Sequence, residues 1–296
     1  MLVTLNEVTV SYTDKKILDN VSFSINDNDK IGIVGINGTG KSTLLKTILG
    51  EVDIQSGEIF RKSGIKIAYL PQQPKFDENA SIIDTALKES KVDNEYEIKA
   101  MLSKLGIDNL DSKISTLSGG EKRRLALAIT LVKQCDLLIL DEPTNHLDIW
   151  MINWLEKYLT KWSKALLLVT HDRYFLERIT NKTLDIELGN VYLYDVNYSN
   201  YLNLKVERAE YQQANYRKLK AILKKEAAWA ALNPQARSTK STERLKRYYE
   251  LEDKTNKLKN NMYMKNIKTI LCGGLVAMLV SCSPQVTTTN YYFDSV

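Results

Sequence analysis

The sequence predicts an α/β domain built on a largely parallel sheet, followed by an α-helical hairpin. From Met1 to about Gly189, short apolar runs typical of strands alternate with helical stretches, which is the pattern of a sheet covered on both faces. One of these runs ends in a glycine-rich turn that leads into a helix. From about Tyr198 the pattern changes to long stretches rich in Lys, Glu, Ala and Gln, which favour helices.

The elements of the α/β part follow from hydrophobic periodicity in chain order. Two apolar runs late in this part are continuous rather than alternating, as expected of strands buried on both faces. Strands are expected at Leu2–Val10, Val21–Ile25, Lys30–Val34, within Glu58–Ala68, at Leu137–Leu140 and at Ala165–Val169. Helices are expected at Lys41–Leu49, in short pieces within Ile82–Leu105, and at Glu121–Val132.

The helical part is interrupted once, at Asn233-Pro234, where proline ends a helix. Two helices of roughly 25 to 30 residues would each extend about 40 Å. An antiparallel hairpin projecting from the first domain is therefore expected. The sequence divides into three segments, 1–197, 198–262 and 263–296.

Composition and charge exclude several classes of protein. With 296 residues, 44% of them hydrophobic and 26% charged, the chain has the composition of a folded globular protein and not of a disordered or fibrous one. The net charge of +5 is uneven, because residues 205–262 hold 15 basic and 7 acidic side chains while residues 1–204 hold 24 and 28. The basic character therefore belongs to the hairpin segment.

Cysteine use and the N-terminal sequence indicate a compartment. Cys135, Cys272 and Cys282 form no spacing typical of zinc ligands, and a reducing compartment is expected. The N-terminus runs into a strand pattern with no basic start and apolar core of the kind that a secretory signal has. A cytoplasmic location is therefore expected for the main body.

A phosphate-binding loop follows the strand Lys30–Val34. The segment matches G-x-x-x-x-G-K-[ST] between a strand and a helix, which is the context that a P-loop requires. Its glycines let backbone N–H groups turn toward a phosphate chain, and the helix N-terminus adds partial positive charge. Lys41 is expected to reach the β- and γ-phosphates, Ser42 to bind Mg²⁺ and Thr43 to extend the cradle. The loop consists of Gly35, Ile36, Asn37, Gly38, Thr39, Gly40, Lys41 and Ser42.

Two carboxylates end the apolar strand Leu137–Leu140. In a parallel sheet the C-terminal ends of strands face the ligand crevice. Asp141 is expected to hold Mg²⁺, largely through water, and Glu142 to act as the general base that orients the attacking water. A solvated acidic strand end is the alternative, which the neighbouring phosphate loop disfavours.

Taken together, these motifs resemble the ABC-type ATPases over residues 1 to about 262. The resemblance implies an ABC ATPase domain of the P-loop NTPase class, with a mixed sheet core, an antiparallel β subdomain and a small helical subdomain. It also implies binding of ATP and Mg²⁺. The resemblance implies that Gln72, or Gln73 in the alternative register, is the Q-loop glutamine and binds Mg²⁺, and that Ser118, Gly119, Gly120 and Glu121 form the signature, which receives a γ-phosphate. It also implies that Asp148 belongs to the D-loop and that His171 is the switch histidine. Tyr12 is implied to stack on adenine, with a surface tyrosine as the alternative.

Two strings resemble one branch, the ABC-F group. They are Asp141–Asp148 and Thr170–Leu176, and residues around Trp229 and Ala236–Lys240 are most similar to the Uup-type subgroup. The resemblance implies two ATPase domains on one chain, no membrane domain, and a charged linker that enters the tRNA region of the ribosome. The interval between Gln72 and Ser118 is short, so no long projecting arm is expected there.

The hairpin segment has its own physical interpretation. Its basic excess, interleaved with Tyr211, Tyr216, Trp229, Tyr248 and Tyr249, suits an RNA backbone with stacking side chains. The alternative is a solvated hairpin whose charges only maintain solubility.

The ATP site of this family is composite, because the signature of a second ABC domain completes it. The sequence contains one phosphate loop and one signature. Either two copies associate, or the chain is the first half of a tandem protein.

The segment 263–296 matches nothing in ABC-F proteins. A basic start at Met264–Lys268, a 12-residue apolar run at Thr269–Val280 and Leu279-Val280-Ser281-Cys282 resemble a lipoprotein signal peptide. The preferred hypothesis is that a truncated ABC-F reading frame is joined near residue 263 to an unrelated frame. The alternatives are a short packed helix and a C-terminal tether that gives weak membrane association.

The expected function is ATP hydrolysis coupled to ribosome or RNA engagement. The rival hypotheses are the ATP-binding subunit of a membrane transporter, which would need a separate transmembrane partner, and a DNA-binding ABC ATPase. The basic hairpin after His171 argues against a stable transmembrane partner.

Overall fold

The structure is a computed structural model that describes residues 1–12, 15–92, 94–231, 242–256 and 258–259. The chain divides into two compact units, Met1–Lys205 and a second that begins at Val206, and each is considered by itself. The expected break at Asn233-Pro234 and the tail 263–296 lie outside the described residues.

A six-stranded sheet forms the centre of the first unit. Five strands are parallel to one another and only the last, at one edge, runs antiparallel to its neighbour. The order is β5 (Ile67–Leu70), β6 (Leu137–Asp141), β7 (Ala165–Val169), β3 (Lys30–Val34), β8 (Lys182–Glu187) and β9 (Asn190–Tyr194). The prediction of a largely parallel sheet is confirmed, as is the mixed sheet implied by the resemblance.

A second sheet is antiparallel and has three strands. Its order is β2 (Lys15–Ile25), β1 (Val3–Tyr12) and β4 (Ser56–Arg61). The expected strand at Val21–Ile25 is the second half of a longer strand, because residues from Lys15 onward also pair with β1 across an irregular register. This sheet is the antiparallel subdomain that the resemblance implies.

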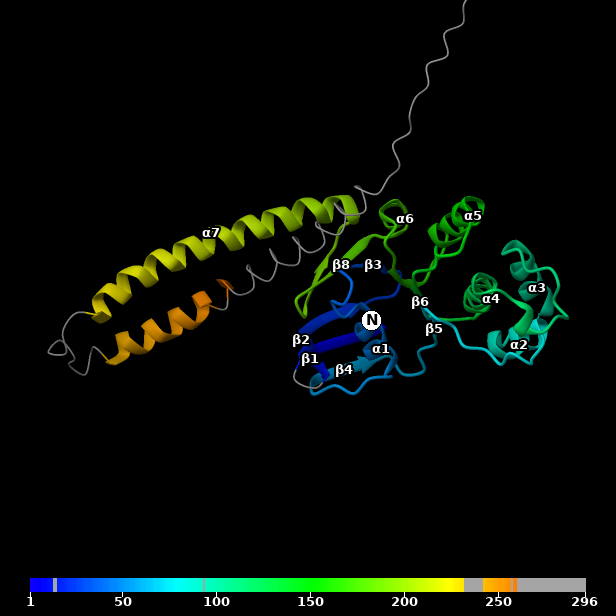
Figure 1. Cartoon of the computed structure of the whole chain (residues 1–296), viewed down its shortest axis with the longest axis horizontal. Coiled ribbons are helices and arrows are strands. Elements are labelled where there is room, and N and C mark those ends of the chain that lie inside the picture. The colour runs from blue at the N-terminus through cyan, green and yellow to red at the C-terminus, as the bar shows by residue number, and fades with distance from the viewer. Residues whose placement is uncertain (13–14, 93, 232–241, 257, 260–296) are drawn as a thin grey trace, which may run out of the picture. The chain divides into compact units, whose positions relative to one another are not determined.

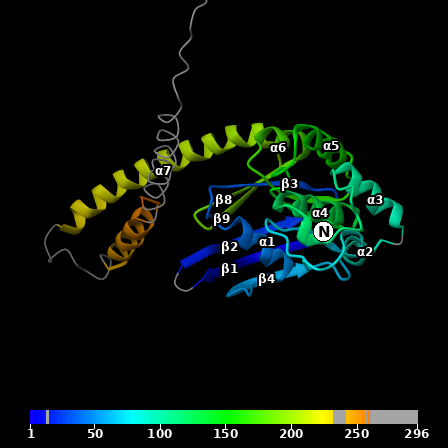
Figure 2. The same ribbon diagram turned by 45° about the vertical axis from the view of Figure 1, so that its right-hand side comes forward.

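Alternation along the buried strands divides the core into two layers, because successive side chains of a strand point to opposite faces. Leu137 and Ile139 of β6 pack with the three-stranded sheet and α1 (Lys41–Leu49), whereas Leu138 and Leu140 pack with the other helices. Figures 1 and 2 show α5 and α6 on the opposite side of the six-stranded sheet from β1, β2 and β4. The helices of that layer are α2 (Ile82–Ser90), α3 (Glu95–Lys104), α4 (Gly119–Val132), α5 (Ile149–Thr160) and α6 (Arg173–Ile179), with a 3₁₀ turn at Ile114–Thr116.

Four elements late in the first unit were not located by periodicity. They are α5, α6, β8 and β9. Side-chain caps define the start of both helices, since Asp148 accepts a bond from the Met151 N–H and Asp172 accepts bonds from Tyr174 and Phe175. These caps are visible in the sequence as Asp residues before apolar runs, so this signal was available.

Helix α7 (Tyr198–Ala231) begins in the first unit and is 34 residues long, more than the expected 25 to 30. Its first turns are attached to the sheet by Asp185 of β8, whose buried carboxylate lies 3.0 Å from Nζ of Lys205. The same ammonium donates to the hydroxyl of Tyr201 at 2.9 Å. The start of the helix therefore has a specific polar attachment to the six-stranded sheet.

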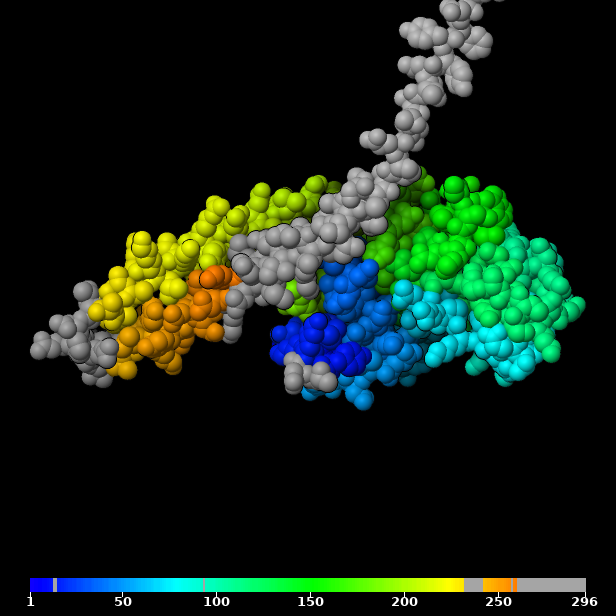
Figure 3. All heavy atoms as spheres, viewed as in Figure 1, coloured from blue at the N-terminus to red at the C-terminus, as the bar shows by residue number. Residues whose placement is uncertain are grey.

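The second unit contains the rest of α7 and a second helical segment at residues 242–256. Figure 3 shows the side chains of these two segments packed alongside each other. Arg244 forms a two-pronged ion pair with Glu226, at 2.8 and 3.1 Å, and its guanidinium lies 4.1 Å from the ring centroid of Trp229. These contacts join the two helical segments of the expected hairpin. Within the described ranges, no helix combines the length and apolar character needed to cross a membrane.

Candidate nucleotide site

The predicted site residues meet at one edge of the six-stranded sheet. Four neighbouring parallel strands, β5, β6, β7 and β3, are followed respectively by Gln72, Glu142, His171 and Gly35. Because the carboxyl ends of parallel strands lie at the same edge, residues that are far apart in sequence become neighbours there. The register pairs Asp141 directly with Val169.

The phosphate loop depends on glycine at two positions. Gly38 and Gly40 have φ angles of 77° and 106°, which side-chain-bearing residues adopt only with strain. A Cβ at Gly40 would also lie 2.8 Å from Cγ2 of Ile17. The Thr39 hydroxyl donates to the Ile36 carbonyl at 2.8 Å, so the Thr39 side chain supports the loop and does not face the cleft. Gly40 is the N-cap of α1, and none of the described side chains caps the N–H groups in the first turn of this helix.

Lys41 lies at the start of α1 with its ammonium close to the loop. Its Nζ donates to the Gly35 carbonyl at 2.7 Å and lies 3.5 Å from Oδ1 of Asn37. Burial lowers the pKa of Lys41, and the charges of Glu142 and Asp141 oppose this shift. A partly desolvated cation held by neutral carbonyls is suited to exchange these weak partners for phosphate oxygens.

A cleft of about 510 Å³ lies over this edge of the sheet. Gln72 lines it, and among the described residues that line it Gln73 does not occur, which favours Gln72 over Gln73 as the Q-loop residue. Gly35, Ile36 and Thr39 build the loop but do not contribute to the lining. The lining residues are Ile17, Asn37, Gly38, Gly40, Lys41, Ser42, Thr43, Gln72, Asp141, Glu142, Asn145, Val169 and His171.

The oxygen donors of this cleft suit Mg²⁺. Ser42 offers a hydroxyl, Gln72 an amide oxygen and Asp141 a carboxylate, and hard oxygen ligands are those that Mg²⁺ prefers alongside phosphate and water. The described residues contain no cluster of three His, Cys, Asp or Glu side chains that could bind a metal ion without such help. Burial, followed by the charge of Glu142, raises the pKa of Asp141, while Arg123 and Lys41 oppose the rise. A cation in the cleft would relieve this unfavourable burial of negative charge.

Glu142 is buried and has a strained backbone, with a φ of 54° that is uncommon for residues other than glycine. Its N–H donates to the Val169 carbonyl at 2.7 Å. One carboxylate oxygen lies 3.4 Å from Nε2 of His171, whose side chain is 64% exposed. A buried carboxylate beside an exposed imidazole at a phosphate cleft has the arrangement expected of a residue that orients water.

The signature segment has a different local role in the structure. Ser118 and Glu121 form a capping box on α4, since the Glu121 carboxylate accepts bonds from the Ser118 N–H at 2.8 Å and the Ser118 hydroxyl at 2.7 Å. Of the described residues that line the cleft, none belongs to Ser118–Glu121. A Cβ on Gly119 would meet no atom within 4 Å, so this turn has an open surface.

Two further predicted residues lie outside the cleft lining. Asp148 caps α5 by accepting from the Met151 N–H at 2.8 Å. Tyr12, at the end of β1, is 49% exposed, and its stacking on adenine stays a prediction.

Four residues of the site were missed by sequence reasoning, namely Ile17, Asn145, Val169 and Arg123. Ile17 and Asn145 line the cleft, and Asn145 follows the predicted Asp141-Glu142 pair closely enough to have been considered. Arg123 of α4 is buried and donates to main-chain carbonyls of the site, including Asp141 at 2.8 Å and Glu142 at 2.6 Å. Nothing in its local sequence distinguishes Arg123 from Arg124, because its partners lie on other elements.

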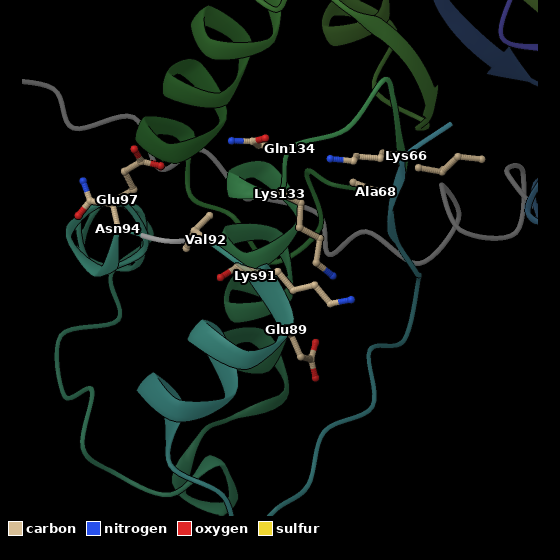
Figure 4. Close-up of a pocket in the computed structure, with 11 residues that line it drawn as sticks. Lys66, Ala68, Glu89, Lys91, Val92, Asn94, Glu97, Lys133 and Gln134 are labelled. Atoms are coloured by element: carbon tan, nitrogen blue, oxygen red, sulfur yellow. The ribbon is translucent and has the colours of Figure 1, made fainter. Parts of the chain in front are cut away.

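A larger hollow, of about 680 Å³, lies elsewhere in the same unit (Figure 4). It is lined by Lys66 and Ala68 at the amino end of β5, by the connection from α2 to α3, and by Lys133 and Gln134 after α4. Gln72 follows the other end of β5. This hollow mixes lysines with Glu89 and Glu97 and contains no predicted site residue, so the smaller cleft is the candidate nucleotide site.

Comparison with known families agrees with the fold. A family model described as ABC transporter matches residues 18–145, and a second model of the same description matches residues 184–266. The chain is 37% identical to the uncharacterised ABC transporter ATP-binding protein YfmR of Bacillus subtilis, over 83% of this chain and 46% of that protein. It is 34% identical to the energy-dependent translational throttle protein EttA of Mycobacterium tuberculosis, over 86% of this chain and 53% of that protein. It is also 34% identical to the ATP-binding protein Uup of Buchnera aphidicola, over 90% of this chain and 46% of that protein.

The chain thus spans about half the length of the curated relatives it matches. Solved structures show the same fold. An ATP-binding subunit of an ABC transporter has a TM-score of 0.60 at 23% identity, over 66% of this chain and 90% of that one. A dimeric bacterial ABC transporter cassette has a TM-score of 0.59 at 22% identity, over 66% and 99%. The chain therefore carries an ABC ATPase domain and belongs to the ABC family of ATP-binding proteins.

Proposed function

We propose that the cleft binds Mg-ATP and that this chain hydrolyses it to ADP and phosphate. The observation that carries this proposal is the convergence of the phosphate loop, Asp141, Glu142 and His171 on one cleft. Lys41 and the loop N–H groups bind the phosphates, and Ser42, Gln72 and Asp141 bind the metal. Bound Mg²⁺ neutralises phosphate charge.

Glu142 and His171 are assigned to the γ-phosphate side of the cleft. The Glu142 carboxylate accepts a hydrogen bond from the attacking water and orients it in line with the γ-phosphorus. His171 contacts the γ-phosphate and holds the Glu142 carboxylate, from which it is 3.4 Å away. Stacking of Tyr12 on the adenine ring belongs to the same proposal.

Hydrolysis on this scheme requires a second ABC domain. The signature turn Ser118–Gly120 has an open surface and does not line the cleft, so a partner's signature is needed to close the γ-phosphate side. The partner is either a second copy of this chain or a further domain of a longer protein. This chain spans about half the length of its relatives, which is compatible with both of these partners.

We further propose that ATP binding is coupled to RNA engagement, with the ribosome as the target. Arg217, Lys218, Lys220, Lys224 and Lys225 of α7 are all exposed, and none forms an ion pair with another described residue. A run of free cations along one helix suits a phosphate backbone. A relative named as a translational throttle protein supports RNA of the translation machinery as this polyanion. Ribosome engagement would take place in the cytoplasm.

The test is co-sedimentation of the full chain with ribosomes at several salt concentrations, with and without Mg-ATP. We expect binding that weakens steeply with salt and that depends on nucleotide. The variant Lys220→Glu/Lys224→Glu should lose most of this binding, whereas Lys88→Glu/Lys104→Glu, which reverses two lysines on α2 and α3, should not. Equal loss in both variants would indicate unspecific charge attraction.

Two other outcomes would replace the ribosome proposal. Stable recovery with an integral membrane protein would favour the transporter subunit. Binding to DNA that ignores ATP would favour a nucleic-acid binding module.

A further inference from the structure

Arg123 connects the signature helix to two separate segments of the nucleotide site. It lies in α4, two residues after the signature Glu121, and its side chain is buried. One terminal nitrogen, Nη1, donates to the main-chain carbonyl of Gln72. The other, Nη2, donates to the carbonyls of Asp141 at 2.8 Å and Glu142 at 2.6 Å.

The partners of this guanidinium are backbone groups, not carboxylates. Its planar fork can bind carbonyls from two segments at once and hold them at a fixed separation. The segments concerned are the loop after β5 and the end of β6. Each carries a side chain of the cleft, Gln72 on the first and Asp141 with Glu142 on the second.

The backbone of Glu142 shows why such a bridge matters. Its left-handed conformation, with φ of 54°, persists only where surrounding contacts enforce it. The N–H of Glu142 is held by the Val169 carbonyl at 2.7 Å, and its own carbonyl is held by Arg123. The peptide groups on both sides of Glu142 are therefore fixed, and with them the direction of its carboxylate.

We propose that Arg123 is a positioning residue, which fixes the Gln72 loop relative to Asp141 and Glu142 and joins both to the helix that presents the signature turn. A shift of α4 would move the carbonyls of Gln72 and Glu142 together. The signature that serves a partner's nucleotide would in this way be mechanically connected to the metal ligands of its own cleft. This inference rests on the metal-binding roles proposed above for Gln72 and Asp141.

The test measures metal binding separately from nucleotide binding on the full chain. ATP affinity is measured without divalent metal, and Mn²⁺ affinity is then measured by electron paramagnetic resonance in the presence of ATP. Arg123→Met removes both charge and fork, and Arg123→Lys keeps the charge but removes the fork. Arg124→Met is the matched control, because Arg124 is the next residue of α4 and has its ion pair with Glu121 at 4.0 Å.

Both Arg123 variants should lose roughly tenfold in Mn²⁺ affinity, as loss of a supporting contact behind metal ligands typically does, with ATP affinity changed less than about twofold. Arg124→Met should change neither the Mn²⁺ affinity nor the ATP affinity. Wild-type Mn²⁺ affinity in both Arg123 variants would overturn the proposal. A parallel loss of ATP and Mn²⁺ affinity would also overturn it, since that is the result of general loss of structure.

Gln72→Ala distinguishes this inference from the site assignment. If Gln72→Ala weakens Mn²⁺ binding and the Arg123 variants do not, the metal role stands and the positioning role fails. If Gln72→Ala leaves Mn²⁺ binding unchanged, the metal role of Gln72 fails, and the positioning role that depends on it fails as well.

Discussion

Nε2 of His171 lies 3.4 Å from Oε1 of Glu142, and the N–H of His171 lies 3.4 Å from the second carboxylate oxygen. Glu142 follows β6 and His171 follows β7, so the parallel pairing of these two strands brings the residues into contact. An exposed imidazole is thereby joined to a buried carboxylate at the cleft edge.

Glu142→Gln should preserve ATP binding and lower turnover by about 10² to 10⁴, because the amide cannot accept a proton from water. Phosphate release measures turnover, and light scattering with and without Mg-ATP measures association of the full-length variant. A dimer that forms only with ATP would mean that two copies complete the site. A monomer that still binds ATP would mean that the second domain comes from elsewhere. Turnover equal to wild type would contradict the role of Glu142.

Lys41→Ala is the complementary variant for phosphate binding. We expect its ATP affinity to fall by at least about tenfold, since a desolvated charge pair is lost. Lys46→Ala, in the last turn of the same helix, should retain affinity. Unchanged ATP affinity in Lys41→Ala would refute the site assignment.

Glu121→Gln should strengthen ATP-dependent association. The Glu121 carboxylate accepts two bonds from Ser118, and these bonds lower the pKa of Glu121, so the signature turn carries a negative charge. A partner's γ-phosphate approaching this helix N-terminus would meet that charge and would compete for the same donors. The amide removes the charge and keeps an oxygen for the capping box.

The readout for Glu121→Gln is the ATP concentration at half-maximal association in the Glu142→Gln background, which should fall about two- to fivefold. Glu97→Gln is the control, because Glu97 also lies in the first turn of a helix, α3. Weaker association in Glu121→Gln than in the control would argue against charge repulsion at the signature.

Asp141→Asn should stabilise the metal-free fold while weakening metal binding. Burial raises the pKa of Asp141 above its ordinary value of 3.8, so ionisation of this carboxyl costs more in the folded chain than in the unfolded chain. The stabilising contribution of the proton is present at low pH and is lost as pH rises through the raised pKa of the folded state. The free energy of unfolding of Asp141→Asn should therefore exceed that of the wild type by more at about pH 7 than at about pH 4.

Urea unfolding in divalent-free buffer measures this difference for Asp141→Asn. Asp111→Asn, on an exposed loop, provides the control. A stability gain that does not depend on pH would show that ionisation of Asp141 is not its cause.

Lys205→Met should destabilise the attachment of α7. It removes the ammonium that lies 3.0 Å from the buried Asp185 carboxylate, and we expect a loss of about 1–3 kcal/mol in the free energy of unfolding. The double variant Asp185→Asn/Lys205→Met should lose less, because the buried negative charge that Lys205 balances is removed together with the cation. Urea unfolding of the wild type, both single variants and the double variant gives the coupling energy. Additive effects would exclude a specific interaction between these residues.

Much of the fold was predictable because its signals are local. The strand Lys30–Val34 and the helix Lys41–Leu49 occur at the expected bounds, since a buried strand, a glycine turn and a helix start are each encoded in a few neighbouring residues. The first half of β2, the Asp-capped helices α5 and α6, and the strands β8 and β9 were less evident. The apolar pattern of these strands is interrupted or short, and pairing with neighbouring strands decides their extent.

The sequence by itself determined which residue types the candidate site contains: a glycine loop with Lys41 and Ser42, and a strand that ends in two carboxylates. These short motifs can be recognised from the sequence because each consists of a few neighbouring residues of particular types at a fixed spacing. Only the tertiary structure decided that Gln72 and not Gln73 lines the cleft, that Glu121 is engaged with Ser118, and that Arg123 joins segments 51 and 19 residues away. These relations depend on side-chain direction and on contacts across elements, which become defined when the helices pack against the sheet.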